Sequence, residues 1–296
     1  MSSIQGESIE KIEKNEYFVD TSSGVTIYTA EKKLEDSATS DAILLIHGLG
    51  GGYAYWDLDF KDYSMMELLA RDGFDVFAVD QRGFGRSTKP DALEVTIEAC
   101  TEDLKSIIDF IKSLRHLEKV HIVGHSFGAE LAVCLAGKYG DHVGKVVPVA
   151  CPYKIFPASY QEGMNGWTEQ LKKGVRYYST THHLTMENNL YSYEEEVVDT
   201  YKDFIDRLYL EVPIGAVINF GSFKHSKYVS NITAPTLLIN GALDPLIDHY
   251  DAMQCFDDLG TNEKALLVIG NASHFVFLEK AARKIMYQAM VSWLHS

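Results

Sequence analysis

The sequence predicts an α/β protein built on a mostly parallel, doubly wound sheet with a helical cap insertion. Three observations lead to this prediction. Short apolar runs alternate with helical segments of ten or more residues, which is typical of parallel strands covered by helices on both faces. The alternation stops between residues 152 and 228 and then resumes. The length of 296 residues suffices for one large core with an inserted segment.

The first half of the chain holds most of the expected strands. Residues 1–14 are polar and are interpreted as a loose leader. Residues 17–20 and 25–28 flank a Thr-Ser-Ser-Gly turn, which predicts an antiparallel hairpin followed by a polar loop. The remaining apolar and helical patterns predict strands at 42–46, 75–80, 120–123 and 145–151, and helices at 64–71 and 97–114.

The second half begins with the break in the pattern. Residues 152–228 contain no strand-like apolar run, but they include helical stretches such as 194–210 and nine of the 17 tyrosines. The later patterns predict strands at 235–240 and 265–269 and a final helix at 278–293. We therefore expect one core domain, residues 15–151 and 229–296, interrupted by a helical cap, residues 152–228.

Composition and charge restrict the partners. The apolar share of 46% and the charged share of 23% are those of an ordinary globular protein. A net charge of −15 argues against nucleic acid or an anionic membrane as a partner, because phosphate groups are bound by clustered Lys and Arg. The expected partner is a small-molecule substrate.

Cysteine use and hydropathy indicate the compartment. The cysteines Cys100, Cys134, Cys151 and Cys255 lie far apart and form no C-x-x-C pair, which favours free thiols over a disulfide framework or a zinc site. The N-terminus lacks a basic region followed by an apolar one, and no stretch reaches the roughly 18 apolar residues of a membrane span. We expect a cytoplasmic protein without a membrane span.

A G-x-S-x-G motif joins a predicted strand to a predicted helix. Residues Gly124–Gly128 read Gly-His-Ser-Phe-Gly, directly after an apolar strand and directly before a helical segment. A sharp strand-to-helix turn brings the residues on either side of Ser126 close together, so glycine is required at both flanks. This context predicts that Ser126 is the nucleophile of such a turn and that its hydroxyl stands clear of the backbone.

A serine nucleophile needs a base and a group that orients the base. In doubly wound sheets these groups follow the carboxyl ends of strands. Asp244 follows the predicted strand 235–240, and His274 follows the strand 265–269. The order Ser126, Asp244, His274 is the order of nucleophile, acid and base in hydrolases with this motif. Asp248 is an alternative acid, and Asp244 is preferred because an Asp-Pro pair directly follows the strand.

These motifs together resemble the α/β-hydrolase fold superfamily, in its cap-bearing serine hydrolase or esterase branch. The resemblance covers the chain from about residue 16 onward and includes His47-Gly48 and the segment 80–87, Asp-x-Arg-Gly-x-Gly-x-Ser. It implies a triad of Ser126, His274 and Asp244. It also implies an oxyanion hole formed by the backbone N–H groups of Leu49 and Phe127. Ala129 replaces a second glycine found in many relatives, and no catalytic consequence is expected.

The other polar residues near these motifs are expected to have supporting roles. By the resemblance, Asp80 would brace its loop together with Arg82. Asp103 is interpreted as a buried hydrogen-bonding residue or a surface residue of its helix. His47 and His125 flank the catalytic loops and are expected to be hydrogen-bonded supports rather than bases.

The insertion suggests the nature of the substrate. Its tyrosines and Trp167, with Trp56 and Phe275 from the core, predict a largely apolar pocket with a few hydroxyl groups. No Arg or Lys cluster is present to hold a phosphate or a coenzyme A tail. His182-His183 has no third ligand at a suitable spacing, so we expect a polar lid loop and no metal or cofactor. The acidic run 194–196 is interpreted as the first turn of a helix.

The favoured function is hydrolysis of a carboxylic ester or lactone of a small, moderately hydrophobic substrate through an acyl-enzyme on Ser126. The same triad also serves carbon–carbon bond hydrolysis, aminopeptidase-type cleavage and perhydrolase chemistry, and these alternatives stay open. A non-catalytic small-molecule receptor on the same scaffold is the alternative from a different class.

Overall fold

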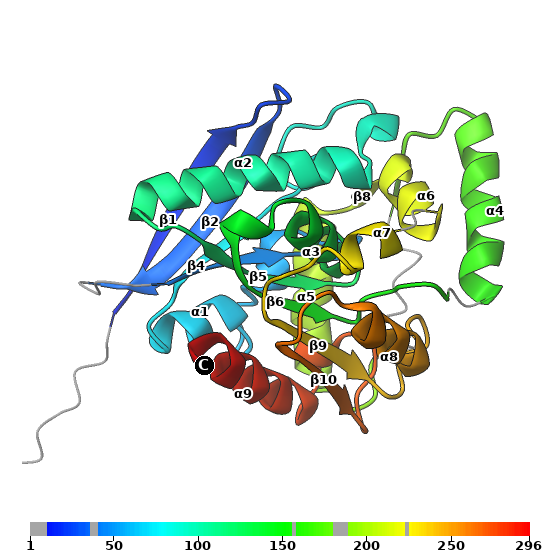
Figure 1. Ribbon diagram of the computed structural model, residues 1–296. Helices are drawn as coiled ribbons and strands as arrows, with labels where there is room; N and C mark the ends of the chain where they lie inside the picture. The colour runs from blue at the N-terminus through cyan, green and yellow to red at the C-terminus, as the bar shows by residue number, and fades with distance from the viewer. Residues whose placement is uncertain (1–10, 36–40, 156–157, 180–188, 223–224) are drawn as a thin grey trace, which may run out of the picture.

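The fold is organised around one large mixed sheet (Figure 1). The computed structural model describes residues 11–35, 41–155, 158–179, 189–222 and 225–296. Within these residues the sheet has eight strands in the order β1-β2-β4-β3-β5-β6-β9-β10. The strands β1 and β2 are antiparallel, β2 pairs antiparallel with β4, and the other pairs are parallel. The strands are β1 (Ile12–Asp20), β2 (Thr26–Leu34), β3 (Ala42–Ile46), β4 (Asp75–Val79), β5 (Val120–His125), β6 (Val143–Val149), β9 (Thr236–Gly241) and β10 (Lys264–Ile269).

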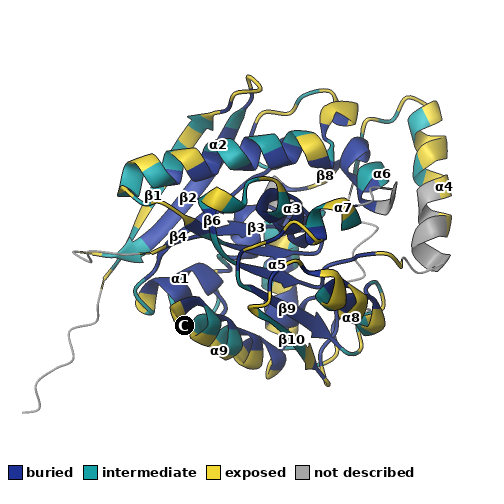
Figure 2. Ribbon diagram, viewed as in Figure 1, coloured by how far each residue is buried: buried dark blue, intermediate teal, exposed yellow. Residues whose placement is uncertain are grey.

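Helices cover both faces of the sheet, which confirms the predicted fold class. One core cluster joins the sheet to α2 and α3, with α8 on the same face, and a second joins it to α1 and α9. Figure 2 shows the central strands buried and the outward sides of these helices exposed. These helices are α1 (Met65–Arg71), α2 (Ile97–Arg115), α3 (Phe127–Lys138), α8 (His249–Asp258) and α9 (Ala282–His295). None of the described helices is both long and apolar enough to cross a bilayer.

The chain between β6 and β9 contributes no described strand to the large sheet. It holds the helices α4 (Ala158–Lys172), α5 (Glu195–Leu208), α6 (Ile214–Ser222) and α7 (Ser226–Val229). It also holds an antiparallel pair, β7 (Tyr177–Ser179) with β8 (Glu211–Pro213). The sequence showed no strand here, because strands of three residues are too short to display an alternating pattern.

The N-terminal hairpin is longer than predicted. Strand β1 already begins at Ile12, inside the expected leader, and β2 runs on to Leu34 through the expected polar loop. The β2 residue Glu31 is fully buried, and its carboxylate pairs with Arg115 of α2 and accepts from the Tyr17 hydroxyl. A charged residue interrupts the apolar pattern by which a strand is recognised in the sequence. Its burial is possible only because residues distant in the chain pair with its charge. At the other end of the chain, α9 begins four residues later than expected, after a 3₁₀ turn over Val276–Leu278.

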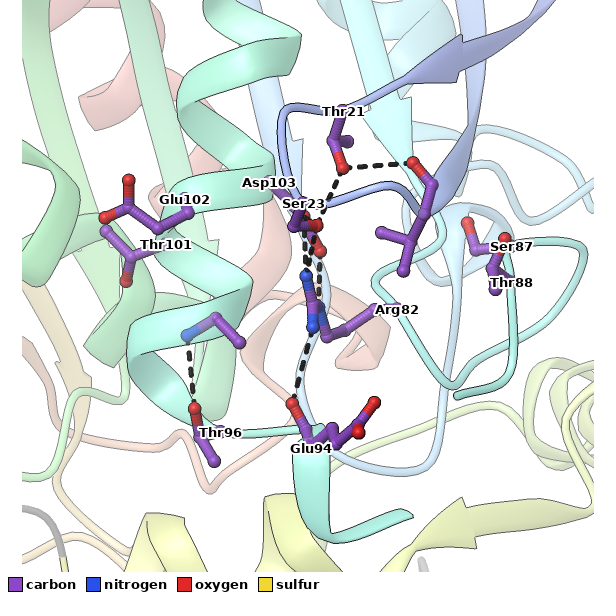
Figure 3. Close-up of polar contacts among 12 residues, drawn as sticks. Thr21, Ser23, Arg82, Ser87, Thr88, Glu94, Thr96, Thr101, Glu102 and Asp103 are labelled. Carbon is purple, nitrogen blue, oxygen red and sulfur yellow. Dashed lines mark hydrogen bonds and ion pairs between the residues drawn. The ribbon is translucent and has the colours of Figure 1, made fainter. Parts of the chain in front are cut away.

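The loop after β4 is braced differently from the prediction. Arg82 does not pair with Asp80 but with Asp103 of α2, through contacts of 2.5 and 2.8 Å (Figure 3). Asp103 also accepts from the Ser23 hydroxyl in the β1–β2 turn, at 2.8 Å. Asp80 instead accepts from the backbone N–H groups of Tyr53 and Arg86, both at 2.8 Å, and therefore does brace its own loop. Burial raises the pKa of Asp80 to about 6.

Candidate active site

Ser126 occupies a strained turn between β5 and α3. Its φ of 56° and ψ of −118° place a non-glycine residue in a region that side chains rarely adopt. A Cβ placed on Gly124 would lie 2.1 Å from the Gly128 carbonyl oxygen, and one on Gly128 would lie 2.3 Å from the Ile46 carbonyl oxygen. The backbone therefore leaves no room for side chains at either flank, as the sequence predicted for this motif.

Asp244 and His274 follow the neighbouring strands β9 and β10, and the fold brings their side chains together. His274 Nδ1 lies 2.8 Å from Asp244 Oδ2, and their side chains are 4% and 0% exposed. The other carboxylate oxygen of Asp244 accepts from the backbone N–H groups of Leu246 and Ile247, at 2.8 and 3.0 Å. Main-chain donors thus hold the Asp244 carboxylate in position, and it in turn orients the His274 ring.

The alternative acid Asp248 lies elsewhere. It forms the N-cap of α8, where its carboxylate accepts from the Tyr250 N–H at 2.8 Å, and its side chain is 50% exposed. The geometry therefore favours Asp244 as the partner of the histidine.

The loop of His274 adjoins the nucleophile turn. The rings of His125 and His274 have centroids 4.7 Å apart, and His125 Nε2 lies 2.8 Å from the His274 carbonyl oxygen. Among the contacts of the described residues, no hydrogen bond joins the Ser126 hydroxyl to His274. Such a bond is commonly long in the absence of substrate and shortens when substrate binds. Because Asp244 occupies Nδ1, Nε2 is the ring nitrogen of His274 that this hydrogen bond leaves available.

Tyr55 is part of this arrangement, although no sequence pattern indicated it. His125 must donate from Nε2 to the His274 carbonyl group, so its Nδ1 accepts a hydrogen bond from the Tyr55 hydroxyl. Burial lowers the pKa of His125 well below its usual value, which keeps the ring neutral and preserves this pattern. His125 is thus a hydrogen-bonded support, as the sequence predicted.

The loop after β3 passes beside Ser126. A Cβ placed on Gly48 would lie 3.2 Å from the Ser126 Cβ. The backbone N–H groups of Leu49 and Phe127 donate to no acceptor within the described part of the chain. Two unengaged donors beside a serine could bind a developing oxyanion. His47 supports this loop by donating from Nδ1 to the Gly48 carbonyl group at 2.7 Å, while its Nε2 accepts from a backbone N–H at 3.1 Å.

The three residues expected in the pocket lie in different places. Phe275 is 4% exposed and packs beside His274, at 5.3 Å between ring centroids. Trp56 is 1% exposed and packs on Phe277 at 5.3 Å, so its ring is enclosed by protein. Trp167 lies on α4 and faces Tyr178 at 6.3 Å. Of the three, only Phe275 adjoins the histidine in the described contacts.

An aromatic cluster links the insertion to the His274 loop. Tyr201 of α5 is buried, and its ring lies 5.9 Å from that of Tyr55 and 6.3 Å from that of Phe275. Within the described residues, no group of three or more His, Cys, Asp or Glu side chains could hold a metal ion. His182 and His183 lie outside the described residues.

Comparison with known proteins identifies the family of the chain. The family model described as "alpha/beta hydrolase fold" matches residues 41–281. A probable lysophospholipase of Arabidopsis thaliana, BODYGUARD 5, is 29% identical over 166 residues, which cover 49% of this chain. The chain spans only 36%, 27% and 22% of the lengths of the first three curated relatives it matches.

Solved structures match over nearly the whole chain. A thermophilic esterase from Thermogutta terrifontis has a TM-score of 0.69 at 20% identity, covering 95% of this chain and 98% of that one. A monoacylglycerol lipase from Paleococcus ferrophilus has a TM-score of 0.71 at 22% identity, covering 90% and 98%. At these identities the structures establish the fold. Together with the family model, which spans most of the sequence, they show that the chain belongs to the α/β-hydrolase fold family.

Proposed function

We propose that the protein is a serine hydrolase that cleaves a carboxylic ester or lactone of a small, moderately hydrophobic substrate. The observation that carries this proposal is the His274–Asp244 hydrogen bond beside a serine in a strained strand-to-helix turn. The relatives named as an esterase, a monoacylglycerol lipase and a probable lysophospholipase support an ester as the substrate class.

Each residue has a definite step in this mechanism. His274 Nε2 takes the Ser126 hydroxyl proton as the serine oxygen attacks the carbonyl carbon of the substrate. The N–H groups of Leu49 and Phe127 bind the oxyanion, which is worth several kcal/mol, about 3 per donor. His274 then gives the proton to the departing alcohol, which leaves an acyl group on Ser126.

Water completes the cycle. His274 removes a proton from a water molecule, which attacks the acyl carbon, and the proton returns to Ser126 as the acid departs. The Asp244 carboxylate stabilises the imidazolium that forms on His274 in both steps. The aromatic cluster of Tyr55, Tyr201 and Phe275 would give the pocket an apolar wall and exclude bulk water.

The test is labelling with a fluorophosphonate probe followed by mass mapping. We expect the probe on the peptide that contains Ser126, and we expect Ser126→Ala to lose both labelling and hydrolysis of short p-nitrophenyl esters, by about 10⁴-fold or more. Ser292→Ala, at an exposed serine of α9, is the matched control and should retain both. Hydrolysis that persists in Ser126→Ala would rule out the acyl-enzyme.

A further inference from the structure

A short segment of the insertion lies across the loop that carries His274. We call residues 189–192 the strap. The strap carbonyl groups of Asn189 and Ser192 accept from the N–H groups of Phe275 and Lys280, at 3.3 and 2.8 Å. The strap N–H of Tyr191 donates to the Glu279 carboxylate at 2.7 Å. The strap is thus held mainly through its backbone.

The side chains of the strap point in opposite directions. Leu190 is 7% exposed and belongs to the same core cluster as Phe275, whereas Tyr191 is 56% exposed. The Tyr191 side chain therefore adds little to the attachment, and its N–H group provides the contact.

Glu279 connects the strap to the catalytic loop through a single oxygen atom. Its Oε1 accepts from Tyr191 N–H at 2.7 Å and from Ser273 N–H, the residue before His274, at 3.0 Å. The side chain is fully buried, and Oε2 has no hydrogen-bond partner among the described residues. Burial raises the pKa of Glu279, and the hydrogen bonds from the Tyr191 and Ser273 N–H groups offset part of this rise. Both described hydrogen bonds of this carboxyl group thus join the strap to the loop of His274.

We propose that Glu279 is a positioning residue that couples docking of the strap to the placement of His274. A docked strap fixes Glu279 Oε1, which fixes the backbone on the N-terminal side of His274. A released strap frees this oxygen and the Phe275 N–H together, so the imidazole loses its fixed position. The catalytic consequence rests on the proposed function, whereas the coupling itself does not.

The first test breaks the contact from the strap side. Tyr191→Pro removes the N–H donor, while Tyr191→Ala keeps it and removes only an exposed ring. Hydrogen exchange of the full chain without substrate reports on the amides of Ser273 and Phe275. In Tyr191→Pro we expect both amides to exchange at least about 10-fold faster and kcat to fall by about 10- to 100-fold. Tyr191→Ala should match the unaltered protein. Unchanged Ser273 exchange in Tyr191→Pro would overturn the proposal.

The second test breaks it from the carboxylate side. Glu279→Gln keeps an acceptor oxygen of the same reach and should retain kcat within about 3-fold, whereas Glu279→Ala should lose about 10-fold or more. In Glu279→Ala the strap amides should exchange faster while the amides of the central strands do not. Lys280→Ala, at the adjacent exposed side chain, is the matched control. A Gln variant as impaired as the Ala variant, or exchange raised throughout the sheet, would contradict the coupling.

The two proposals fail separately. If Ser126 takes no label while Tyr191→Pro still accelerates exchange at Ser273, the proposed function falls and the coupling stands. If Ser126 is labelled and the Ser273 amide exchanges at the same rate in Tyr191→Pro as in the unaltered protein, the coupling falls and the proposed function stands.

Discussion

Buried histidines fix the loops around Ser126 through their hydrogen bonds. His47 is fully buried, and both of its ring nitrogens have backbone partners, one as donor and one as acceptor. Burial lowers its pKa to about 4. In the unfolded chain a histidine ordinarily titrates near pH 6.5. Between this pH and about 4, His47 is therefore protonated in the unfolded chain and neutral in the folded protein, so lowering the pH favours unfolding.

This difference predicts a pH dependence of stability. The contribution of His47 is fully present above pH 6.5 and is lost as the pH falls toward about 4. We compare the free energies of unfolding of the unaltered protein and of His47→Asn. The first minus the second should fall by about 1.4 kcal/mol for each unit by which the pH is lowered within this window. Urea unfolding at several pH values measures it. His249→Asn, at a partly exposed ring, is the control, and an equal slope in both variants would refute the assignment.

At the scale of elements, a buried ion pair ties three of them together. Arg82, in the loop after β4, and Asp103, on α2, are 6% and 3% exposed at their side chains, and both contact Ser23 in the hairpin turn (Figure 3). Removing one member of a buried pair leaves the other charge without compensation.

We therefore expect Arg82→Met to lower the free energy of unfolding by about 3–5 kcal/mol, measured by chemical denaturation. The double variant Arg82→Met with Asp103→Leu should recover most of the loss, because no isolated charge then remains buried. Lys105→Ala removes a more exposed pair with Asp109 on the same helix and should cost only about 0.5 kcal/mol. A double variant as unstable as the single one would show that Asp103 is not the source of the cost.

At the scale of the whole molecule, the negative net charge disfavours nucleic acids as partners. The net charge of −15 gives a repulsive field toward phosphate groups. We expect no shift of a labelled DNA or RNA duplex in a gel at about 0.1 M salt with protein at micromolar concentration, where basic proteins bind non-specifically. A salt-dependent shift under these conditions would reveal a local basic surface that outweighs the total charge.

Much of the architecture is local in origin and could therefore be predicted. The apolar runs that became β3, β4 and β9 are continuous because strands buried on both faces have no polar side. The position of Ser126 could be predicted for a similar reason, since only glycine fits at 124 and 128 when the backbone turns so sharply. Asp244 and His274 could be proposed as acid and base because each follows a strand of a parallel sheet.

Contacts between distant segments account for what the sequence did not show. Nothing local marks Glu31 as a buried strand residue, Asp103 as the partner of Arg82, or Tyr55 as the donor to His125. The role of Glu279 could not be predicted from the sequence either, because its two hydrogen-bond donors lie 6 and 88 positions away in the chain. The sequence by itself determined the central strands of the large sheet, the fold class and the turn at Ser126, because periodicity and backbone sterics act over a few residues. Only the tertiary structure decided which polar side chains meet, because a buried polar group is defined by partners that folding brings to it.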